Sequence, residues 1–252
     1  MNSILLMYLT VPVFLAAVFT SVAQEVQEVT DFYSFGSKLL NQTHIKIVVF
    51  IGEYIYCASF LQFPCLIALS FCVLIHRYGL ILRQFNVYLR SMNIQTKYAD
   101  YIDVLRNYNI IEEKIHLLKR SLSLPLFIVL LNGFFALYTV LSLSMYNDFR
   151  PYIMIEMGCN AFSGVFLLSS LTIFASGIPH YISEIKNTAA FLIEEHQLSE
   201  FNRDKEIRIL ERIEKKDLIY LSACGLVDFK KSFLLTAFGT FLTYGLLIMH
   251  LN

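Results

Sequence analysis

Charged residues are scarce in this sequence. Asp, Glu, Lys and Arg together make up 16% of the 252 residues, whereas 56% are hydrophobic. A soluble domain carries about 25% charged residues. The apolar residues also gather in long uninterrupted runs, which is typical of membrane-spanning segments. The composition therefore argues against an ordinary soluble domain and predicts an integral membrane protein.

A net charge is also missing, because 20 basic residues balance 20 acidic ones. A nucleic-acid partner therefore has no electrostatic support. The five cysteines include no Cys-x-x-Cys pair, and their odd count argues against a disulfide scaffold and a zinc site. The sequence has no HExxH, GxSxG or P-loop motif either. We therefore expect no enzyme, no metal and no cofactor.

Five apolar segments are long enough to cross a bilayer, since a helix needs about 20 residues for a hydrocarbon core of about 30 Å. We predict spans over residues 4–22, 47–75, 124–145, 157–178 and 233–251. The first has an alternative interpretation as a signal peptide, because it ends in Ser21-Val22-Ala23. The predicted fold class is an all-α membrane protein with about five transmembrane helices, in a single domain over 1–252.

The segments between the spans set the orientation. Residues 77–120 include eight basic and four acidic side chains, whereas 24–46 include two basic and three acidic ones. The positive-inside rule therefore predicts 77–120 in the cytoplasm and 24–46 outside. The sequon Asn41-Gln42-Thr43 falls in the outer segment, where Asn41 is a candidate glycosylation site. Following the spans in order leaves the C-terminus outside.

The two cytoplasmic segments, about 77–123 and 179–231, have the pattern of amphipathic helices. In the second, charged residues of both signs surround apolar ones at helical spacing, namely Ile182, Ile185, Ala189, Leu192, Ile207, Leu210, Ile213 and Leu218. We predict long helical extensions below the membrane. They would either make contacts between subunits or form the solvated stalk of a monomer.

The last span carries a stripe of hydroxyl groups. Thr236, Thr240, Thr243 and Leu247 follow one another at steps of four and three residues, so they share one helical face. Such a face could line a water-filled path. Alternatively, each Thr hydroxyl bonds the carbonyl oxygen four residues back, as is common in membrane helices.

The stretch ACGLVDFKKSFLLTAFGTFLTYGLLIMHL, residues 223–251, resembles the C-terminal signature of the arthropod gustatory receptors. In that family a Gly-rich segment leads into a helix with Thr-Tyr, five mostly apolar residues and then Gln-Phe. Gly225, Leu226, Thr243 and Tyr244 match this signature. The resemblance implies a seven-helix protein with an internal N-terminus, and a tetrameric ligand-gated cation channel whose last helix lines the pore. The five predicted spans would be helices three to seven, so the chain would be truncated at its N-terminus.

The end of the signature departs from the family, because His250 and Leu251 stand at the Gln and Phe positions. By resemblance they would form the gate, with Leu251 closing the pore by dewetting. The expected pore residues are Thr236, Thr240, Thr243, Tyr244, Leu247, His250 and Leu251. We also expect His250 to make conduction sensitive to acid, unless it merely anchors the helix at the headgroups.

A ligand pocket is expected between the outer halves of the second, third and fourth spans. The candidate residues are Glu53, Tyr54, Tyr56, Phe135, Tyr138, Glu156 and Asn160. Aromatic rings with a few polar groups suit a small-molecule tastant such as a sugar or a bitter compound. The carboxyls of Glu53 and Glu156 are costly near a membrane unless they are solvated or functional. The tyrosines could alternatively be interface anchors.

These observations predict a gustatory-receptor-like chemoreceptor in the plasma membrane of a sensory neuron. It would bind a tastant, contact membrane lipid and open a channel as a homo- or hetero-tetramer, with no nucleic-acid partner. A G-protein-coupled receptor would have an internal C-terminus and an Asp-Arg-Tyr-like step, which the sequence lacks. A transporter would have unwound helices and charges at mid-membrane, and Pro64 is the only helix interruption of note in the spans.

Overall fold

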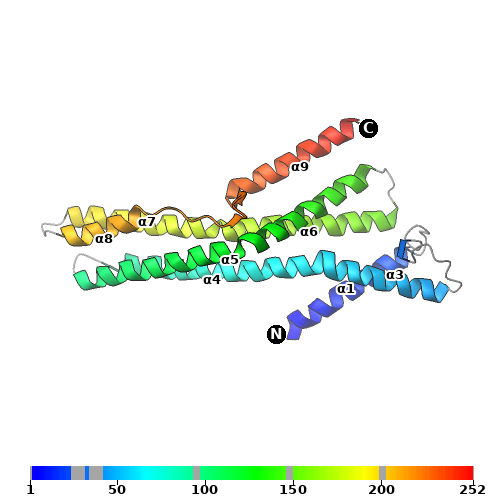
Figure 1. The fold of residues 1–252 in the computed structure, drawn as a ribbon, viewed down its shortest axis with the longest axis horizontal. Helices are drawn as coiled ribbons and strands as arrows, with labels where there is room; N and C mark the ends of the chain where they lie inside the picture. The colour runs from blue at the N-terminus through cyan, green and yellow to red at the C-terminus, as the bar shows by residue number, and fades with distance from the viewer. Residues whose placement is uncertain are drawn as a thin grey trace. The chain divides into compact units, whose positions relative to one another are not determined.

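The computed structural model describes the backbone of residues 2–23, 32–33, 42–92, 97–145, 150–198 and 203–251, and the side chains within 10–22, 32–33, 43–92, 97–144, 150–198 and 203–247. The elements are α1 (Asn2–Ala23), α3 (Gln42–Tyr56), η1 (Cys57–Gln62), α4 (Phe63–Arg90), α5 (Tyr98–Met145), α6 (Pro151–Ala175), α7 (Gly177–Gln197), α8 (Asp204–Glu214), β1 (Ser222–Ala223), β2 (Val227–Asp228) and α9 (Lys231–Leu251) (Figure 1). Across these residues the fold is all-α apart from one short hairpin, which confirms the all-α part of the predicted class.

Among the residues that the structure describes, three helical stretches are long and apolar enough to cross a membrane, namely Thr43–Arg90, Tyr98–Ser144 and Pro151–Gln197. They contain the second, third and fourth predicted spans. Each extends beyond its apolar part, because 47 residues at 1.5 Å per residue measure about 70 Å, more than twice the hydrocarbon core. The first and fifth predicted spans lie in α1 and α9, and the count of five stays a prediction.

The chain divides into two compact units. The first unit comprises Met1–Leu69, Val129–Leu168 and Thr240–Asn252, and the second comprises Ser70–Ile128 and Ser169–Gly239. The helices α4, α5, α6 and α9 each contribute residues to both.

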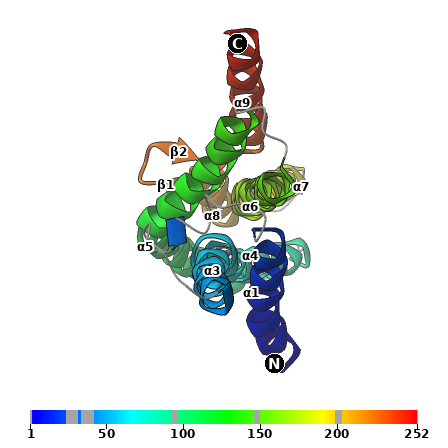
Figure 2. The same cartoon turned by 90° about the vertical axis from the view of Figure 1, so that its right-hand side faces the viewer.

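In the first unit, α1 packs against α3 and η1 (Figures 1 and 2). Phe19, Cys57 and Leu61 form a buried hydrophobic cluster at this junction. The helices α5 and α6 approach closely at two glycines, because a Cβ atom on Gly164 would stand only 2.9 Å from the carbonyl oxygen of Gly133. Small residues let membrane helices approach in this way.

The element η1 is a π-helical turn that joins α3 to α4 without a break. The N–H of Phe63 donates to the carbonyl oxygen of Ala58, five residues back. Pro64 follows directly, and in a regular α-helix its ring would collide with the carbonyl of Phe60. A wider turn before the proline relieves such a collision. Pro64 therefore widens this helix but does not unwind it.

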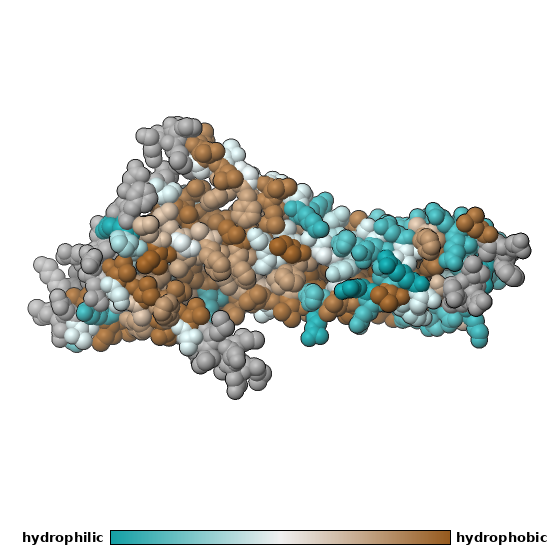
Figure 3. Space-filling model, turned by 180° about the vertical axis from the view of Figure 1, so that it is seen from behind, coloured by the Kyte–Doolittle hydropathy of each residue, from teal (hydrophilic) through white to brown (hydrophobic). Residues whose placement is uncertain are grey.

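The second unit includes α7 and α8, which lie side by side (Figure 1). The apolar stripe of α8, formed by Ile209, Leu210 and Ile213, is buried. The face of this unit that is seen in Figure 3 carries most of the hydrophilic surface of that view. The helical prediction is confirmed over 179–197 and 204–214, whereas the cytoplasmic location of these helices stays a prediction.

The prediction of helix is wrong after Glu214. Leu218, which the helical pattern included, follows the end of α8 in an irregular segment that leads into β1. Ile219, Leu221 and Ala223 are buried in this segment, and so is Ser222 between the last two.

The turn of this hairpin cannot be helical. Cys224 and Gly225 have positive φ angles of 51° and 70°, which right-handed helices do not allow. The N–H of Cys224 donates to the carbonyl oxygen of Ser123 at 3.2 Å.

Candidate functional site

A cluster of polar side chains lies in the first unit, between α3 and α6. Glu53 is fully buried, and the hydroxyl of Tyr152 donates to its Oε1 at 2.8 Å. Tyr56 lies one turn further along the same helix, and its hydroxyl donates to Glu156 Oε1 at 3.5 Å. Nδ2 of Asn160 donates to the Tyr56 hydroxyl oxygen at 3.0 Å and to the Glu156 carbonyl oxygen at 3.0 Å. Steps of three or four residues on each helix bring these side chains onto two facing sides.

Among the residues with described side chains, the Glu53 carboxyl has only neutral partners. Its hydrogen bonds come from the hydroxyls of Tyr152 and Tyr33. Its Oε2 is buried and has no hydrogen-bond partner among the residues with described side chains. The ring of Tyr33 occupies the space that a Cβ atom at Gly52 would need. A buried carboxylate without a paired cation costs several kcal/mol, so this position favours binding of a proton or of a cation.

An apolar pocket of about 370 Å³ opens in the same unit. It is lined by Val11, Pro12, Leu15, Cys57, Leu61, Gln62, Cys65, Gly158, Cys159, Phe162 and Ser163, from α1, η1, α4 and α6. Within this wall, Cys57 and Leu61 belong to the hydrophobic cluster against which Tyr56 and Tyr152 pack. The pocket and the polar cluster therefore share one wall. The volume lies at the lower end of the range for small-ligand sites.

The structure brings together four of the seven predicted ligand residues, namely Glu53, Tyr56, Glu156 and Asn160. Tyr54 is half-buried on α3 and takes no part in the hydrogen bonds of this cluster. Phe135 and Tyr138 are 66% and 65% exposed on α5, away from the cluster. The pocket is lined by the first predicted span and not by the third, which differs from the expected location.

Sequence reasoning missed Tyr152 and Tyr33. For Tyr152 a signal existed, because Tyr152, Glu156 and Asn160 follow one another at steps of four on one helix and therefore share a face. For Tyr33 no periodic signal exists, since it lies outside the predicted spans.

The predicted pore stripe of α9 is exposed in the single chain. Thr236, Thr240 and Thr243 are exposed, and Tyr244 and Leu247 are 59% and 54% exposed. The Thr236 hydroxyl donates to the carbonyl oxygen of Ser232 at 3.2 Å, so the alternative of local backbone bonding holds at this position.

The opposite side of α9 packs on α5, where a Cβ atom on Gly245 would stand 3.2 Å from Leu141 Cδ2. At about 100° per residue, Gly245 lies nearly opposite Thr240, Thr243 and Leu247. The side chains of His250 and Leu251 lie outside the described part of the structure, and so does Asn41. Within the described residues, no group of three or more His, Cys, Asp and Glu side chains could hold a metal ion.

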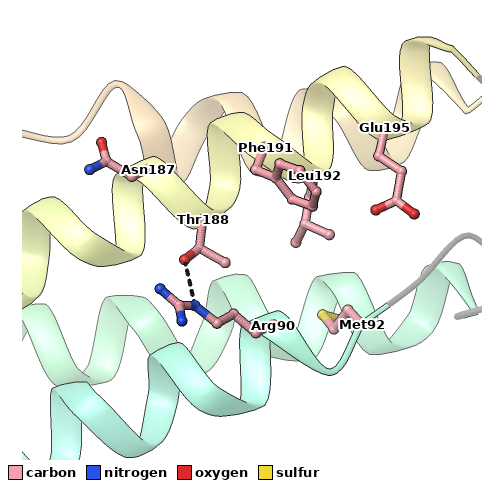
Figure 4. Close-up of a pocket in the computed structure, with 7 residues that line it drawn as sticks. All are labelled: Arg90, Met92, Asn187, Thr188, Phe191, Leu192 and Glu195. Carbon is pink, nitrogen blue, oxygen red and sulfur yellow. Dashed lines mark hydrogen bonds between the residues drawn. The ribbon is translucent and has the colours of Figure 1, made fainter.

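The second unit has a pocket of its own, of about 430 Å³, between the end of α4 and α7 (Figure 4). Its lining residues are Arg90, Met92, Asn187, Thr188, Phe191, Leu192 and Glu195. Nε of Arg90 donates to Thr188 Oγ1 at 3.4 Å, and the Thr188 hydroxyl donates to Asn86 Oδ1 at 2.8 Å. These bonds fasten α4 to α7 beside the pocket.

A buried pair joins α5 to α7 in the same unit. The Tyr101 hydroxyl and Nε2 of His196 lie 2.6 Å apart, and both side chains are buried. Burial lowers the pKa of His196, and the nearby positive charge of Arg203 lowers it further. His196 is therefore held neutral.

Comparison with protein-family models and with curated proteins found no match to this chain.

Proposed function

We propose that this chain is a gustatory-receptor-like chemoreceptor of the plasma membrane. It is a subunit of a tetrameric channel that opens to cations when a small-molecule tastant binds. The observation that carries the proposal is a stripe of exposed hydroxyl groups on α9, opposite its contact with α5. Its Thr stripe is exposed, while the opposite side packs on α5 at Gly245. An exposed polar stripe on an apolar helix is what a pore between subunits requires.

The tastant binds at the polar cluster and apolar pocket of the first unit. Intramembrane carboxyls such as Glu53 and Glu156 are costly, and for that reason they mark functional sites. The π-helical turn η1 lines the pocket, and such turns are frequent at functional sites.

Contacts within the first unit supply a route from the ligand to the pore helix. The ligand residues Glu156 and Asn160 lie on α6, which packs on α5 at Gly164 and Gly133. In turn, α5 packs on α9 through Leu141. Because packed helices shift as rigid bodies, a small rotation of α6 on ligand binding is passed through α5 to α9.

Thiol labelling of α9 tests the pore proposal. Thr240→Cys and Thr243→Cys place a thiol on the pore stripe, whereas Leu242→Cys places one about 120° away, at a position that is also exposed in the single chain. We expect a charged thiol reagent to reduce cation current through the two Thr variants and not through the Leu242 variant or the native chain. Equal block of all three variants, or block of the Leu242 variant alone, would contradict a pore lined by this stripe.

The transporter alternative gains little from the helix interruption at Pro64, because η1 keeps the helix continuous there. A transporter site of this kind is built on unwound helices.

A further inference from the structure

The two acidic side chains of the polar cluster lack a cationic partner. Glu53 is fully buried, and Glu156 is half-buried on the facing helix. No Lys, Arg or His side chain pairs with either of them among the residues whose side chains are described, and Oε2 of Glu53 has no hydrogen-bond partner in that set. Two neighbouring carboxyls in an apolar region favour the entry of positive charge.

The surroundings of the carboxyls suit an organic ammonium group better than a metal ion. The hydroxyls of Tyr33, Tyr56 and Tyr152 donate to them, and the carboxyl and hydroxyl oxygens together offer acceptors for the three N–H donors of an ammonium group. A calcium ion takes six to eight oxygen ligands and magnesium keeps several waters. The described residues contain no group of three or more His, Cys, Asp and Glu side chains that could hold a metal ion.

The pocket that shares a wall with this cluster is apolar. Leu15, Leu61 and Phe162 dominate its lining, and Gln62 and Ser163 are its main polar side chains. A sugar in this pocket would leave many of its hydroxyls without hydrogen-bond partners, which is costly. A hydrocarbon or aromatic body instead gains by burial against these side chains.

We propose that the ligand of the first unit is an amphipathic organic amine. Its ammonium group pairs with Glu53 and Glu156 among the tyrosines, and its apolar body occupies the pocket along η1 and α6. This inference rests on the function proposed above, because it names the ligand class of the same site.

A thermal-shift experiment on the full chain in lipid nanodiscs tests this assignment with two probes of the same shape. One is 2-phenylethylamine, which is positively charged at pH 7.5, and the other is the neutral 2-phenylethanol. At about ten times its Kd, the amine should raise the Tm by about 4 °C, and the alcohol should leave it unchanged. Glu53→Gln should abolish the shift, and the exposed Glu113→Gln should retain it. Should Glu53→Gln fail to fold, Glu156→Gln provides the same test.

An equal shift with amine and alcohol, no shift with the amine, or a shift that survives both Glu53→Gln and Glu156→Gln would overturn the assignment. A comparable shift with sodium chloride alone would also overturn it, in favour of an inorganic cation. The test requires no current, so it separates the two proposals. Binding of the amine without channel opening refutes the channel and leaves the ligand class intact. Opening by neutral tastants alone, with no binding of the amine, refutes the ligand class and leaves the channel intact.

Discussion

The close approach of α5 and α6 yields a prediction with an internal control on one helix. A methyl group added at Gly164 would lie 2.7 Å from Leu137 Cγ and 2.9 Å from the carbonyl oxygen of Gly133. The second of these atoms is backbone, so the helices themselves must separate. Overpacking of this kind costs about 1–3 kcal/mol. The higher helix propensity of Ala offsets about 0.5–1 kcal/mol of this cost, so Gly164→Ala should destabilise the chain by about 1–2 kcal/mol.

Gly158 is the matched control, because it lies on the same helix and a Cβ atom there would meet nothing within 4 Å. Gly158→Ala should therefore show only the propensity gain of about 0.5–1 kcal/mol. The two variants should differ by about 2 kcal/mol, or about 4–8 °C in Tm, in thermal unfolding scans of the purified chain in nanodiscs. Equal Tm values for Gly164→Ala and Gly158→Ala would refute the close helix contact and, with it, the route from α6 through α5 to the pore helix.

Three further predictions concern the second unit. Because burial lowers the pKa of His196, the unfolded chain binds a proton on this side chain more tightly than the folded chain does. The stability contributed by His196 should therefore be intact above about pH 6.5 and decline below it. The Tm difference between pH 7.5 and pH 5.5 should shrink in the variant His196→Asn. Lys216 is partly buried, its ammonium group pairs with Glu112, and its backbone carbonyl accepts a hydrogen bond from Lys186. Lys216→Met should lower the stability by about 1 kcal/mol. Lys215→Met removes an exposed ion pair and should leave the Tm unchanged. Gly225→Ala should cost about 1 kcal/mol because of the positive φ angle of 70°, and an unchanged Tm would contradict that backbone conformation.

Periodicity predicted the long helices because these depend on local spacing. The apolar runs and the amphipathic stripe of α7 and α8 are visible in the sequence, and Glu53 with Glu156 stands out because carboxyls are rare in apolar segments.

The hairpin after Glu214 was missed for a different reason. Its residues satisfy helical and extended spacing about equally well, so the choice depends on the turn at Cys224-Gly225 and on its bond to Ser123, about 100 residues earlier in the chain. The pocket on η1 was also invisible, because its α1 wall depends on which helices pack together. Long-range contacts of this kind leave no periodic trace in the sequence.

The most direct test of the proposed channel concerns the orientation of α9, since the resemblance of 223–251 implies a pore helix that runs outward. An epitope tag placed after Asn252 would be detected by antibody on intact, unpermeabilised cells. We expect the antibody to label the surface of intact cells. For the protein at the plasma membrane, permeabilisation should not increase this labelling. Labelling only after permeabilisation, with the protein shown by surface biotinylation to reach the plasma membrane, would contradict the orientation and the pore assignment together.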